Sequence, residues 1–510
     1  RNIRGAKALS AELVDRLVDS ADQLDDAARD LIRRSPAPRR APFAQRILSW
    51  GPLRPFIARK VRAGVARKVR PDHYPAPYAI VDLWERYGAR GREAYDAEAA
   101  SIARLFLSPT ARNLVRVFFL QDGLKSQRIA GGRTPQRVHV VGAGVMGGDI
   151  AAWCALRGLE VTLQDRAEEY LRPALARAAA LFEKRIKDPA KRAEAAARLR
   201  ADLAGDGVAQ ADVVVEAIVE DADAKRALYA KLEPQLAPGA IIATNTSSIR
   251  LEELTSALAS PGRLVGLHFF NPVAQMPLIE IVQGASTAPE SAGTAIALAR
   301  RLDKFPLPCR SAPGFLVNRV LSAYMQEAML VAREGVPLPL IDAVAVDFGM
   351  AMGPVELSDV VGLDICRHVS GIVAAGLGRP LPDTRELDER IAAGKLGKKS
   401  GEGLYLWREG KPVKDAAGSA AGAAVPPDLQ DRLMLALANE AVACLREGIV
   451  ADADKIDAGM IFGAGYPPFR GGPLKAARDR GAADCVARLR ELAGKYGPRF
   501  TADTGWALLD

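Results

Sequence analysis

Short apolar runs alternate with amphipathic segments from about residue 136 to residue 310. The runs that predict strands are residues 137–141, 160–164, 212–216, 240–244, 264–268 and 278–282. Helical periodicity fills most of the intervals between them. Strands that alternate with helices in this way form a mainly parallel sheet with helices on both faces, so this region is predicted to be an α/β domain.

Helical periodicity dominates after about residue 310, and this part of the chain contains an internal repeat. The repeated motifs are Glu327–Gly335, Ile341-Asp342 and Gly353-Pro354 in the first copy and Glu440–Gly448, Ile456-Asp457 and Gly472-Pro473 in the second. The repeat predicts two copies of one helical unit, over residues 310–411 and 428–510. An Ala/Gly/Pro-rich linker is predicted between them, over residues 412–427.

The N-terminal quarter has no strand pattern. Residues 5–20 are predicted to form a short helix, and the two prolines in residues 73–77 are predicted to interrupt helical structure. An Ala-rich helical stretch runs from about Val81 to Lys125. Residues 33–134 are therefore predicted to be a helical linker ahead of the α/β domain.

The composition is that of a globular protein, with 49% hydrophobic and 26% charged residues among 510. The net charge of +9 is local, because Arg33–Arg70 holds twelve Lys or Arg and no acidic residue, and the other 472 residues carry −3. A nucleic-acid-binding surface is not predicted. The five cysteines lack a Cys-x-x-Cys pair, which favours free thiols, and no metal site is predicted.

The basic segment contains a stripe of apolar residues with a period of four. The stripe consists of Leu53, Ile57, Val61, Val65 and Val69. A basic amphipathic helix of this kind suits an anionic membrane surface or a partner subunit. The alternative is a helix that packs on the protein itself and exposes a charged face to solvent.

The first predicted strand runs directly into a glycine-rich turn. The turn is Gly142-Ala-Gly144-Val-Met146-Gly147, and a helical pattern follows it. Glycines at this spacing permit a tight turn and let backbone N–H groups at the helix N-terminus approach a pyrophosphate. Because a strand precedes the motif and a helix follows it, the motif predicts a dinucleotide site rather than a turn that serves packing alone.

The second predicted strand ends in Asp165, 23 residues after Gly142. A carboxylate at this position accepts hydrogen bonds from a ribose diol and repels a 2′-phosphate, which predicts NAD as the cofactor. The neighbouring Arg166 argues in the other direction, because an arginine there can bind the 2′-phosphate of NADP. FAD uses the same fingerprint, but the reactive residues described next suit hydride transfer from an alcohol.

His268 is the histidine best placed for chemistry. It ends a predicted strand, and open α/β sheets bind ligands at the carboxyl ends of their strands. Glu280 lies in the next strand-like run, where a hairpin-like return sets its carboxylate against the imidazole and raises the basicity of the ring. The pair predicts a general base. The alternatives are a histidine that is merely hydrogen-bonded in the core and a glutamate that faces solvent on an edge strand.

Five motifs occur over residues 136–407 in a specific order and spacing. They are Gly142–Gly147, Val215-Glu-Ala-Ile-Val-Glu220, Asn245-Thr-Ser-Ser248, His268-Phe-Phe-Asn-Pro272 and Pro313-Gly-Phe-Leu-Val-Asn-Arg319. Together they resemble the L-3-hydroxyacyl-CoA dehydrogenase family. The resemblance implies a Rossmann-type NAD-binding domain over residues 135–309, followed by an all-α C-terminal domain that is duplicated here. It also implies NAD-dependent oxidation of (S)-3-hydroxyacyl-CoA to 3-ketoacyl-CoA in fatty-acid β-oxidation.

The resemblance also assigns roles to single residues. His268 is implied to be the catalytic base with Glu280 as its partner, and Ser247 and Asn318 are implied to contact the substrate. The residues implied to bind NAD are Gly142, Gly144, Met146, Gly147, Asp165, Glu220, Lys225 and Asn271. The chemistry of Ser247 and Asn318 agrees, because both supply neutral donors for a developing oxygen anion. A helix cap is the alternative interpretation of Asn318.

The N-terminal part extends the resemblance to multifunctional enzymes. Residues 1–32 are similar to the end of a crotonase, or enoyl-CoA hydratase, fold. Residues 73–77 and Phe118-Phe-Leu120 resemble the linker of fused hydratase/dehydrogenase α-subunits of β-oxidation complexes. By this resemblance the acidic residues of the hydratase lie upstream of residue 1, so hydratase activity is not expected from this chain. A thiolase β-subunit is implied as a partner and acyl-CoA as the substrate.

Two other functions compete with this interpretation. One is a catalytically inactive scaffold that binds CoA and NAD, and the other is a dehydrogenase of a different 3-hydroxy acid. The presence of Ser247, His268, Glu280 and Asn318 together favours catalysis. The expected location is the bacterial cytoplasm or the inner surface of the membrane, with Arg33–Arg70 as the membrane-facing segment.

Overall fold

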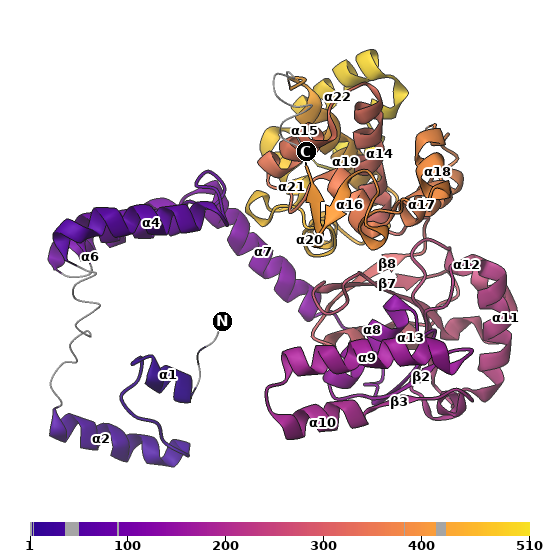
Figure 1. Cartoon of the computed structure of the whole chain (residues 1–510), viewed down its shortest axis with the longest axis horizontal. Helices are drawn as coiled ribbons and strands as arrows, with labels where there is room; N and C mark the ends of the chain where they lie inside the picture. The colour runs from indigo at the N-terminus through magenta and orange to yellow at the C-terminus, as the bar shows by residue number, and fades with distance from the viewer. Residues whose placement is uncertain are drawn as a thin grey trace. The chain divides into compact units, whose positions relative to one another are not determined.

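The computed structural model describes residues 3, 5–35, 50–88, 91–381, 383–414 and 425–509. The chain forms two compact units, residues 1–105 and residues 106–510. The second unit contains an α/β domain and a helical domain (Figure 1).

The described residues of the first unit form helices. They are α1 (Ala6–Ser10), α2 (Leu24–Arg34), α4 (Arg54–Ala66), α5 (Pro75–Tyr87) and α6 (Arg92–Phe106). The prediction of a helix over residues 5–20 is wrong in its extent, because α1 buries only Ala8 and packing supplies most of a helix's stability. The prolines in residues 73–77 open α5 rather than interrupt it, since the first turn of a helix does not need their missing N–H groups. The likeness of residues 1–32 to a crotonase fold stays a prediction.

The basic amphipathic helix forms as α4, which packs against α5 but ends at Ala66, so Val69 of the predicted stripe lies beyond it. Arg62 makes an ion pair of 2.6 Å with Asp82 and a second one with Glu85. Of the apolar stripe, Leu53 and Val61 are exposed, while the other three residues are half-buried. Part of the stripe therefore packs against the unit itself, and the rest of the stripe is exposed to solvent. Residues 36–49 of the basic segment lie outside the described residues.

The α/β domain contains an eight-stranded sheet. Its strands are β1 (Arg137–Val141), β2 (Glu160–Gln164), β3 (Leu199–Ala201), β4 (Val213–Glu216), β5 (Ile241–Thr244), β6 (Leu264–Phe269), β7 (Leu278–Gln283) and β8 (Phe305–Arg310). The strand order is β3-β2-β1-β4-β5-β6-β7-β8, and every neighbouring pair is parallel except β6 and β7. The predicted mainly parallel sheet is confirmed, and the antiparallel pair is the hairpin-like return that joins residues 268 and 280.

The strand pattern in the sequence did not indicate β3 or β8. Strand β8 contains Pro306 and Pro308, which cannot donate to a neighbouring strand. Prolines are tolerated here because β8 lies at the edge of the sheet. Strand β3 is at the opposite edge and spans only three residues, too few for a recognisable alternation.

Helices cover both faces of the sheet. They are α8 (Val145–Leu156), α9 (Glu168–Arg185), α10 (Pro189–Ala197), α11 (Ala222–Leu232), α12 (Leu251–Leu254) and α13 (Pro289–Arg301). Alternate residues of β4 enter different cores: Val213 and Val215 pack on one side with residues of α8 and α9, and Val214 packs on the other side with Tyr229 of α11. A strand buried on both faces explains why the sequence shows an unbroken apolar run there.

In the described part of the helical domain, the two copies of the repeat form two sets of four helices. The first set is α14 (Val317–Arg333), α15 (Leu338–Phe348), α16 (Pro354–Val361) and α17 (Leu363–Gly376), and the second is α19 (Leu429–Arg446), α20 (Ala453–Ala464), α21 (Pro473–Arg480) and α22 (Ala482–Tyr496). Helix α18 (Arg385–Ala392) and a hairpin of β9 (Leu406–Arg408) and β10 (Lys411–Val413) follow the first set. The linker predicted from residue 412 therefore starts too early, because β10 pairs with β9. Residues 415–424 lie outside the described residues.

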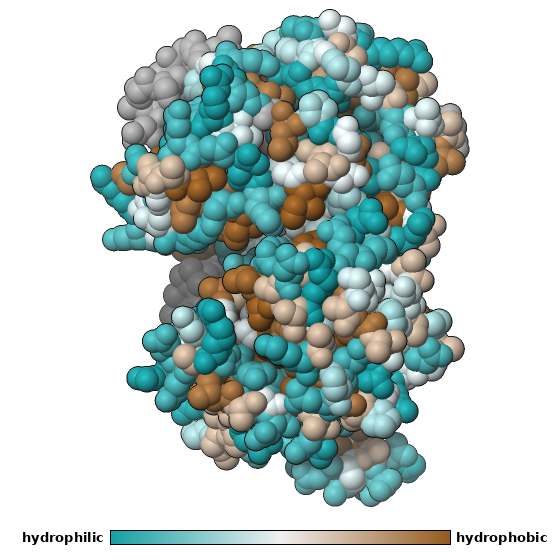
Figure 2. All heavy atoms as spheres, turned by 90° about the vertical axis from the view of Figure 1, so that its right-hand side faces the viewer, coloured by the Kyte–Doolittle hydropathy of each residue, from teal (hydrophilic) through white to brown (hydrophobic). Residues whose placement is uncertain are grey.

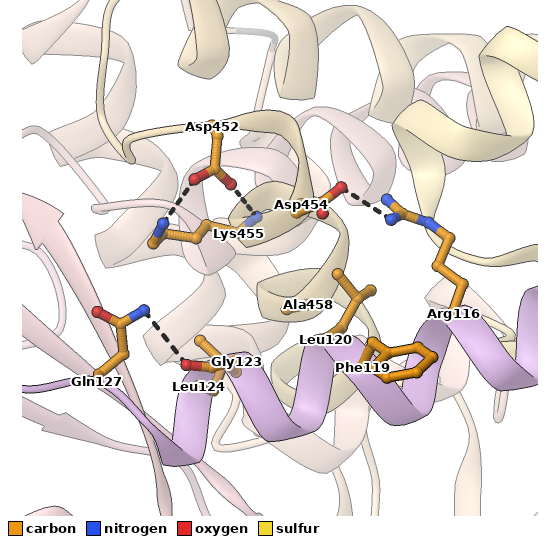
Figure 3. Close-up of a pocket in the computed structure, with 10 residues that line it drawn as sticks. All are labelled: Arg116, Phe119, Leu120, Gly123, Leu124, Gln127, Asp452, Asp454, Lys455 and Ala458. Atoms are coloured by element: carbon orange, nitrogen blue, oxygen red, sulfur yellow. Dashed lines mark hydrogen bonds and ion pairs between the residues drawn. The ribbon is translucent and has the colours of Figure 1, made fainter.

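Helix α7 (Pro109–Lys125) packs on the second set of helices. Its Arg116 bonds to Asp457 of α20 at 2.6 Å, and its Asn113 donates to the carbonyl of Phe469 at 2.9 Å. A pocket of about 440 Å³ lies between α7 and α20 (Figure 3). Its charged side chains form ion pairs within the chain, for example Lys455 with Asp452 and Arg116 with Asp454, so we assign no ligand to it.

The face of the molecule in Figure 2 is mainly hydrophilic, with hydrophobic residues in scattered patches. All five cysteines are free thiols, and burial raises the pKa of Cys154 to about 12. Among the described residues we find no group of His, Cys, Asp and Glu side chains with the geometry of a metal site. In the same part of the chain, no helix has the length and apolar character needed to cross a bilayer.

Candidate active site

The glycine-rich turn joins β1 to α8 in the form that a pyrophosphate requires. Gly142 has φ +103°, and a Cβ there would lie 2.5 Å from the carbonyl oxygen of Ala217. A Cβ at Gly147 would lie 1.8 Å from the carbonyl oxygen of Gly142. Gly144, at the N-terminus of α8, instead faces open space, and no side chain caps that helix. The turn thus leaves helix N–H groups accessible to an anion, and the residues present fit a dinucleotide.

Asp165 lies beside this turn. Its Oδ2 accepts a hydrogen bond of 2.6 Å from the backbone N–H of Ala143, and its Oδ1 accepts one of 2.7 Å from that of Arg166. The Arg166 guanidinium lies 5.6 Å from the centre of the Tyr170 ring on α9. The carboxylate is therefore fixed next to the predicted phosphate position, while the arginine side chain is engaged by an aromatic ring.

His268 and Glu280 face each other across the antiparallel strands β6 and β7. The strand register pairs these two residues directly, and His268 Nδ1 lies 2.7 Å from Glu280 Oε2. Both side chains are almost completely buried, at 4% and 0% exposed. The alternative of a glutamate facing solvent on an edge strand is therefore wrong. With Glu280 ionised, Nδ1 carries the proton and Nε2 is the basic nitrogen of the ring.

The helical domain holds the second oxygen of Glu280. Oε1 accepts hydrogen bonds from the backbone N–H groups of Leu316 at 3.1 Å and Val317 at 3.0 Å. These groups lie at the N-terminus of α14, whose dipole favours a negative charge. A tight turn precedes the helix, in which Gly314 has φ +71°. The sequence did not reveal this contact, because it joins residues that are far apart in the chain.

Ser247 and Asn318 are brought together at the same domain boundary. Asn318 Nδ2 donates to the carbonyl oxygen of Ser247 at 3.1 Å. Asn318 lies one residue inside α14, which begins at Val317 with Leu316 as its N-cap, so its interpretation as a helix cap is wrong. Asn245, to which sequence analysis gave no role, accepts a hydrogen bond of 3.0 Å from the N–H of Phe269 and so ties the end of β5 to the residue after His268.

Two aromatic rings pack against the His268 imidazole. The ring of Phe270 lies 4.6 Å away and that of Phe315 lies 5.7 Å away, measured between ring centres. Apolar walls of this kind exclude water from a proton-transfer site. The aromatic residues beside His268 and inside the Pro313–Arg319 motif were a signal in the sequence that we did not interpret.

Glu220 links the predicted NAD site to the loop that carries Ser247. Its Oε1 accepts hydrogen bonds from Thr246 Oγ1 at 2.5 Å and from the N–H of Ser247 at 2.8 Å. Burial on its own raises the pKa of Glu220, but the Lys225 ammonium and these hydrogen bonds lower it below its ordinary value. Lys225 is 1% exposed and is paired with both Glu216 and Glu220. Of the other predicted NAD residues, Asn271 is exposed and Met146 is half-buried.

Comparison with known proteins identifies the family. Residues 137–312 match the model for the NAD-binding domain of 3-hydroxyacyl-CoA dehydrogenase, and residues 314–407 match the model for its C-terminal domain. The chain belongs to the 3-hydroxyacyl-CoA dehydrogenase family. It is thus an NAD-dependent dehydrogenase of 3-hydroxyacyl-CoA in fatty-acid oxidation.

Relatives of this dehydrogenase include proteins that are longer than this chain. The fatty acid oxidation complex subunit alpha of Acinetobacter baylyi is 35% identical over 96% of this chain and 72% of the relative. That of Pseudomonas entomophila is 34% identical over 98% of this chain and 73% of the relative. The similarity to these subunits includes the N-terminal unit, which neither family model covers.

Solved structures of dehydrogenases share the fold of the second unit. The 3-hydroxybutyryl-CoA dehydrogenase of Escherichia coli K12 is 29% identical, with a TM-score of 0.65 over 74% of this chain and 98% of its own. The (S)-3-hydroxybutyryl-CoA dehydrogenase of Ralstonia eutropha is 33% identical, with a TM-score of 0.51 over 54% of this chain and 100% of its own. The Rossmann-type domain followed by a helical domain is therefore confirmed.

Proposed function

We propose that this dehydrogenase oxidises (S)-3-hydroxyacyl-CoA to 3-ketoacyl-CoA with His268 as the general base. The observation that carries this proposal is the buried hydrogen bond of 2.7 Å between His268 Nδ1 and Glu280 Oε2. It leaves Nε2 to take the proton of the 3-hydroxyl group. NAD, when bound, accepts the hydride from C3. Glu280 then stabilises the imidazolium ion that proton transfer creates.

Ser247 and Asn318 are proposed to orient the reacting oxygen. Ser247 lies in the loop that follows β5 and Asn318 lies at the start of α14, so the substrate is held where the two domains meet. Neutral donors near the oxygen stabilise the negative charge that develops as the proton leaves. Lys225 is proposed to act through Glu220, whose carboxylate it fixes, because its ammonium is buried between two carboxylates.

The proposed reaction is tested in its reverse direction. Acetoacetyl-CoA and longer 3-ketoacyl-CoA substrates are added to the protein with NADH, and loss of absorbance at the NADH band is followed. Consumption of NADH that depends on the CoA thioester supports the proposal. Binding of NAD without any turnover supports the inactive scaffold, and turnover of free 3-keto acids alone supports a dehydrogenase of another 3-hydroxy acid.

Asp165 is proposed to select NAD over NADP. Asp165→Ala is expected to weaken NAD binding and to reduce the difference between the KM values for NADH and NADPH. The ribose of NAD loses a hydrogen-bond acceptor, and the 2′-phosphate of NADP is no longer repelled by a carboxylate. The KM values for both cofactors measure this effect. Asp206→Ala, at an exposed site in the same domain, is the control and is expected to leave both values unchanged. Equal use of NADH and NADPH by the unmodified protein would contradict this role.

The basic segment is proposed to attract anionic lipid through α4 and the residues that follow it. Arg59, Lys60, Arg67 and Lys68 are all exposed. Each cation near an anionic surface contributes about 1 kcal/mol, and salt screens the attraction. We expect the protein to sediment with anionic vesicles at low salt and to be released at high salt.

A charge-matched control separates this effect from net charge. Changing those four residues to Gln is expected to abolish most sedimentation, whereas changing Arg172, Lys184, Lys187 and Lys191 of the α/β domain to Gln is expected to retain it. Dehydrogenase activity should survive the first set, which lies outside the active site. Failure to sediment at low salt would exclude the membrane and leave a thiolase-like subunit as the proposed partner of the segment.

A further inference from the structure

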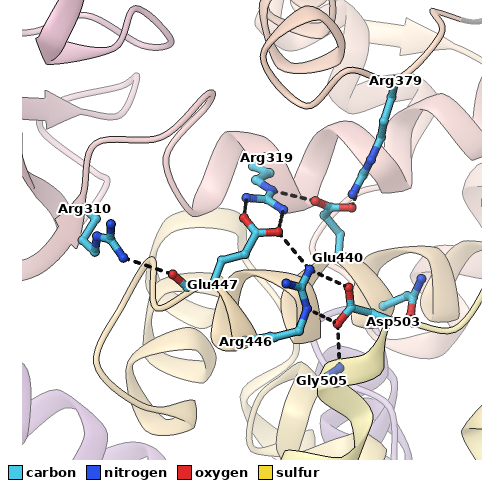
Figure 4. A network of polar contacts seen from close by, with 9 residues as sticks. Arg310, Arg319, Arg379, Glu440, Arg446, Glu447, Asp503 and Gly505 are labelled. Atoms are coloured by element: carbon cyan, nitrogen blue, oxygen red, sulfur yellow. Dashed lines mark hydrogen bonds and ion pairs between the residues drawn. The ribbon is translucent and has the colours of Figure 1, made fainter.

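A buried arginine in the first turn of α14 is held by the second set of helices. Arg319 is 1% exposed, and its Nε donates to Glu440 Oε1 at 2.6 Å (Figure 4). Its Nη1 and Nη2 donate to the two oxygens of Glu447 at 2.5 and 3.0 Å. The hydrogen bonds from Arg319 keep the pKa of Glu447 below its usual range, so the pair is ionised at neutral pH.

The repeat supplies a second network of the same chemistry. Arg432 of α19, also 1% exposed, donates from Nε to Glu327 at 2.7 Å. Its Nη1 and Nη2 donate to Glu334 at 2.5 and 2.7 Å. Each copy therefore inserts one arginine between two glutamates of the other copy. Helix α14 supplies the arginine of the first network, and α19 supplies the arginine of the second.

Only one of these networks leads to the active site. Arg319 directly follows Asn318, and the N–H groups of Leu316 and Val317 hold Glu280 Oε1 at 3.1 and 3.0 Å. At the corresponding start of α19, the N–H of Leu429 donates to the carbonyl of Pro426 instead. The two ion-pair networks thus have different neighbours. The network of Arg319 lies next to a turn that binds the carboxylate of Glu280, and the network of Arg432 lies next to a turn that bonds only to a local carbonyl.

We propose that Arg319 is a positioning residue for the dehydrogenase reaction and that the second helical repeat acts on His268 through it. This inference rests on the proposed roles of His268 and Glu280. Glu440 and Glu447 fix Arg319, which fixes the first turn of α14, and that turn fixes both Glu280 and Asn318. Loss of a carboxylate leaves a buried guanidinium partly unpaired, so the turn shifts to relieve it. Small shifts at a proton-transfer site reduce turnover strongly.

The repeat provides a matched pair of variants for the test. Glu447→Gln and Glu334→Gln each remove the charge that binds both terminal nitrogens of a buried arginine. Both are expected to lower Tm by similar amounts. Only Glu447→Gln is expected to reduce kcat, by about threefold to tenfold, because only it displaces groups of the active site. It should also move the midpoint of the pH–rate profile for oxidation to lower pH, and speed amide exchange at Leu316 and Val317.

Equal kcat values and equal pH profiles for the two variants would overturn the inference. If Glu447→Gln fails to fold, the milder pair Arg379→Gln and Arg499→Gln decides in its place. Arg379, half-exposed, binds Glu440 at 2.5 Å, and Arg499 binds Glu327 at 2.7 Å. Only the first is then expected to shift the pH profile. Failure of the proposed function has a different signature, because His268→Gln would then keep normal turnover.

Discussion

Replacing His268 with glutamine is expected to lower kcat by about 10²- to 10⁴-fold, the range in which general-base catalysis contributes. Glutamine keeps a polar side chain beside the Phe270 and Phe315 rings but has no basic nitrogen. The affinity for NAD should change little, because His268 is not among the predicted cofactor residues, most of which lie on the glycine-rich turn and near the ends of β2 and β4. Steady-state oxidation rates and NAD titration measure the two quantities separately.

His139→Gln is the matched control for this substitution. His139 lies in β1 with its ring nitrogens 2.8 Å from Thr162 Oγ1 and 3.0 Å from Gln164 Oε1. It is as buried as His268, but its hydrogen bonds go to uncharged side chains and the nearest carboxylate, that of Asp202, lies 3.7 Å from Nδ1. Its loss is expected to reduce stability and to leave kcat within a few-fold of normal. Near-normal turnover of His268→Gln would remove His268 from the mechanism.

The strands next to the glycine-rich turn could be predicted from the sequence almost residue by residue. Strands β1 and β2 have the predicted bounds because both are short apolar runs that end in a turn or a charged residue. Strand β8 was missed because its two prolines contradict strand propensity, which the edge position overrides. Local sequence rules therefore predict strands in the centre of the sheet, and they fail for a strand that forms only because of its position at the edge.

In the candidate site, too, some contacts could be predicted from the sequence and others could not. The contact between His268 and Glu280 could be predicted because it forms between two successive strands, whose antiparallel return sets the register. The N–H groups of Leu316 and Val317 could not, since they reach Glu280 only after the helical domain packs on the sheet. The repeat could likewise be read from the sequence, but not the exchange of arginines between its copies. That exchange depends on how α14 and α19 lie against each other.

Glu280→Gln is expected to produce the second-largest loss in this protein, about 10- to 100-fold in kcat. Glutamine can still accept the hydrogen bonds from Leu316 and Val317 through its amide oxygen, but its NH2 group then faces His268 Nδ1 and favours the imidazole tautomer with the proton on Nε2. The charge is lost, and the imidazolium ion formed during oxidation has no anionic partner. Because removing a nearby negative charge disfavours the protonated ring, the base becomes available at lower pH. The midpoint of the pH–rate profile for oxidation should therefore move to lower pH.

Glu280→Asp distinguishes the effect of the side chain's charge from the effect of its length. It keeps the carboxylate but withdraws it from His268 Nδ1, so we expect a loss of rate with a smaller shift of the pH midpoint than in Glu280→Gln. Measuring both variants over the same pH range distinguishes an electrostatic role from a purely steric one. If neither variant moves the midpoint, the charge of Glu280 does not act on the base, and the hydrogen bond of 2.7 Å serves only to orient the ring. In that case the variants of Glu447 should leave the pH profile unchanged as well, since the second repeat reaches His268 only through Glu280.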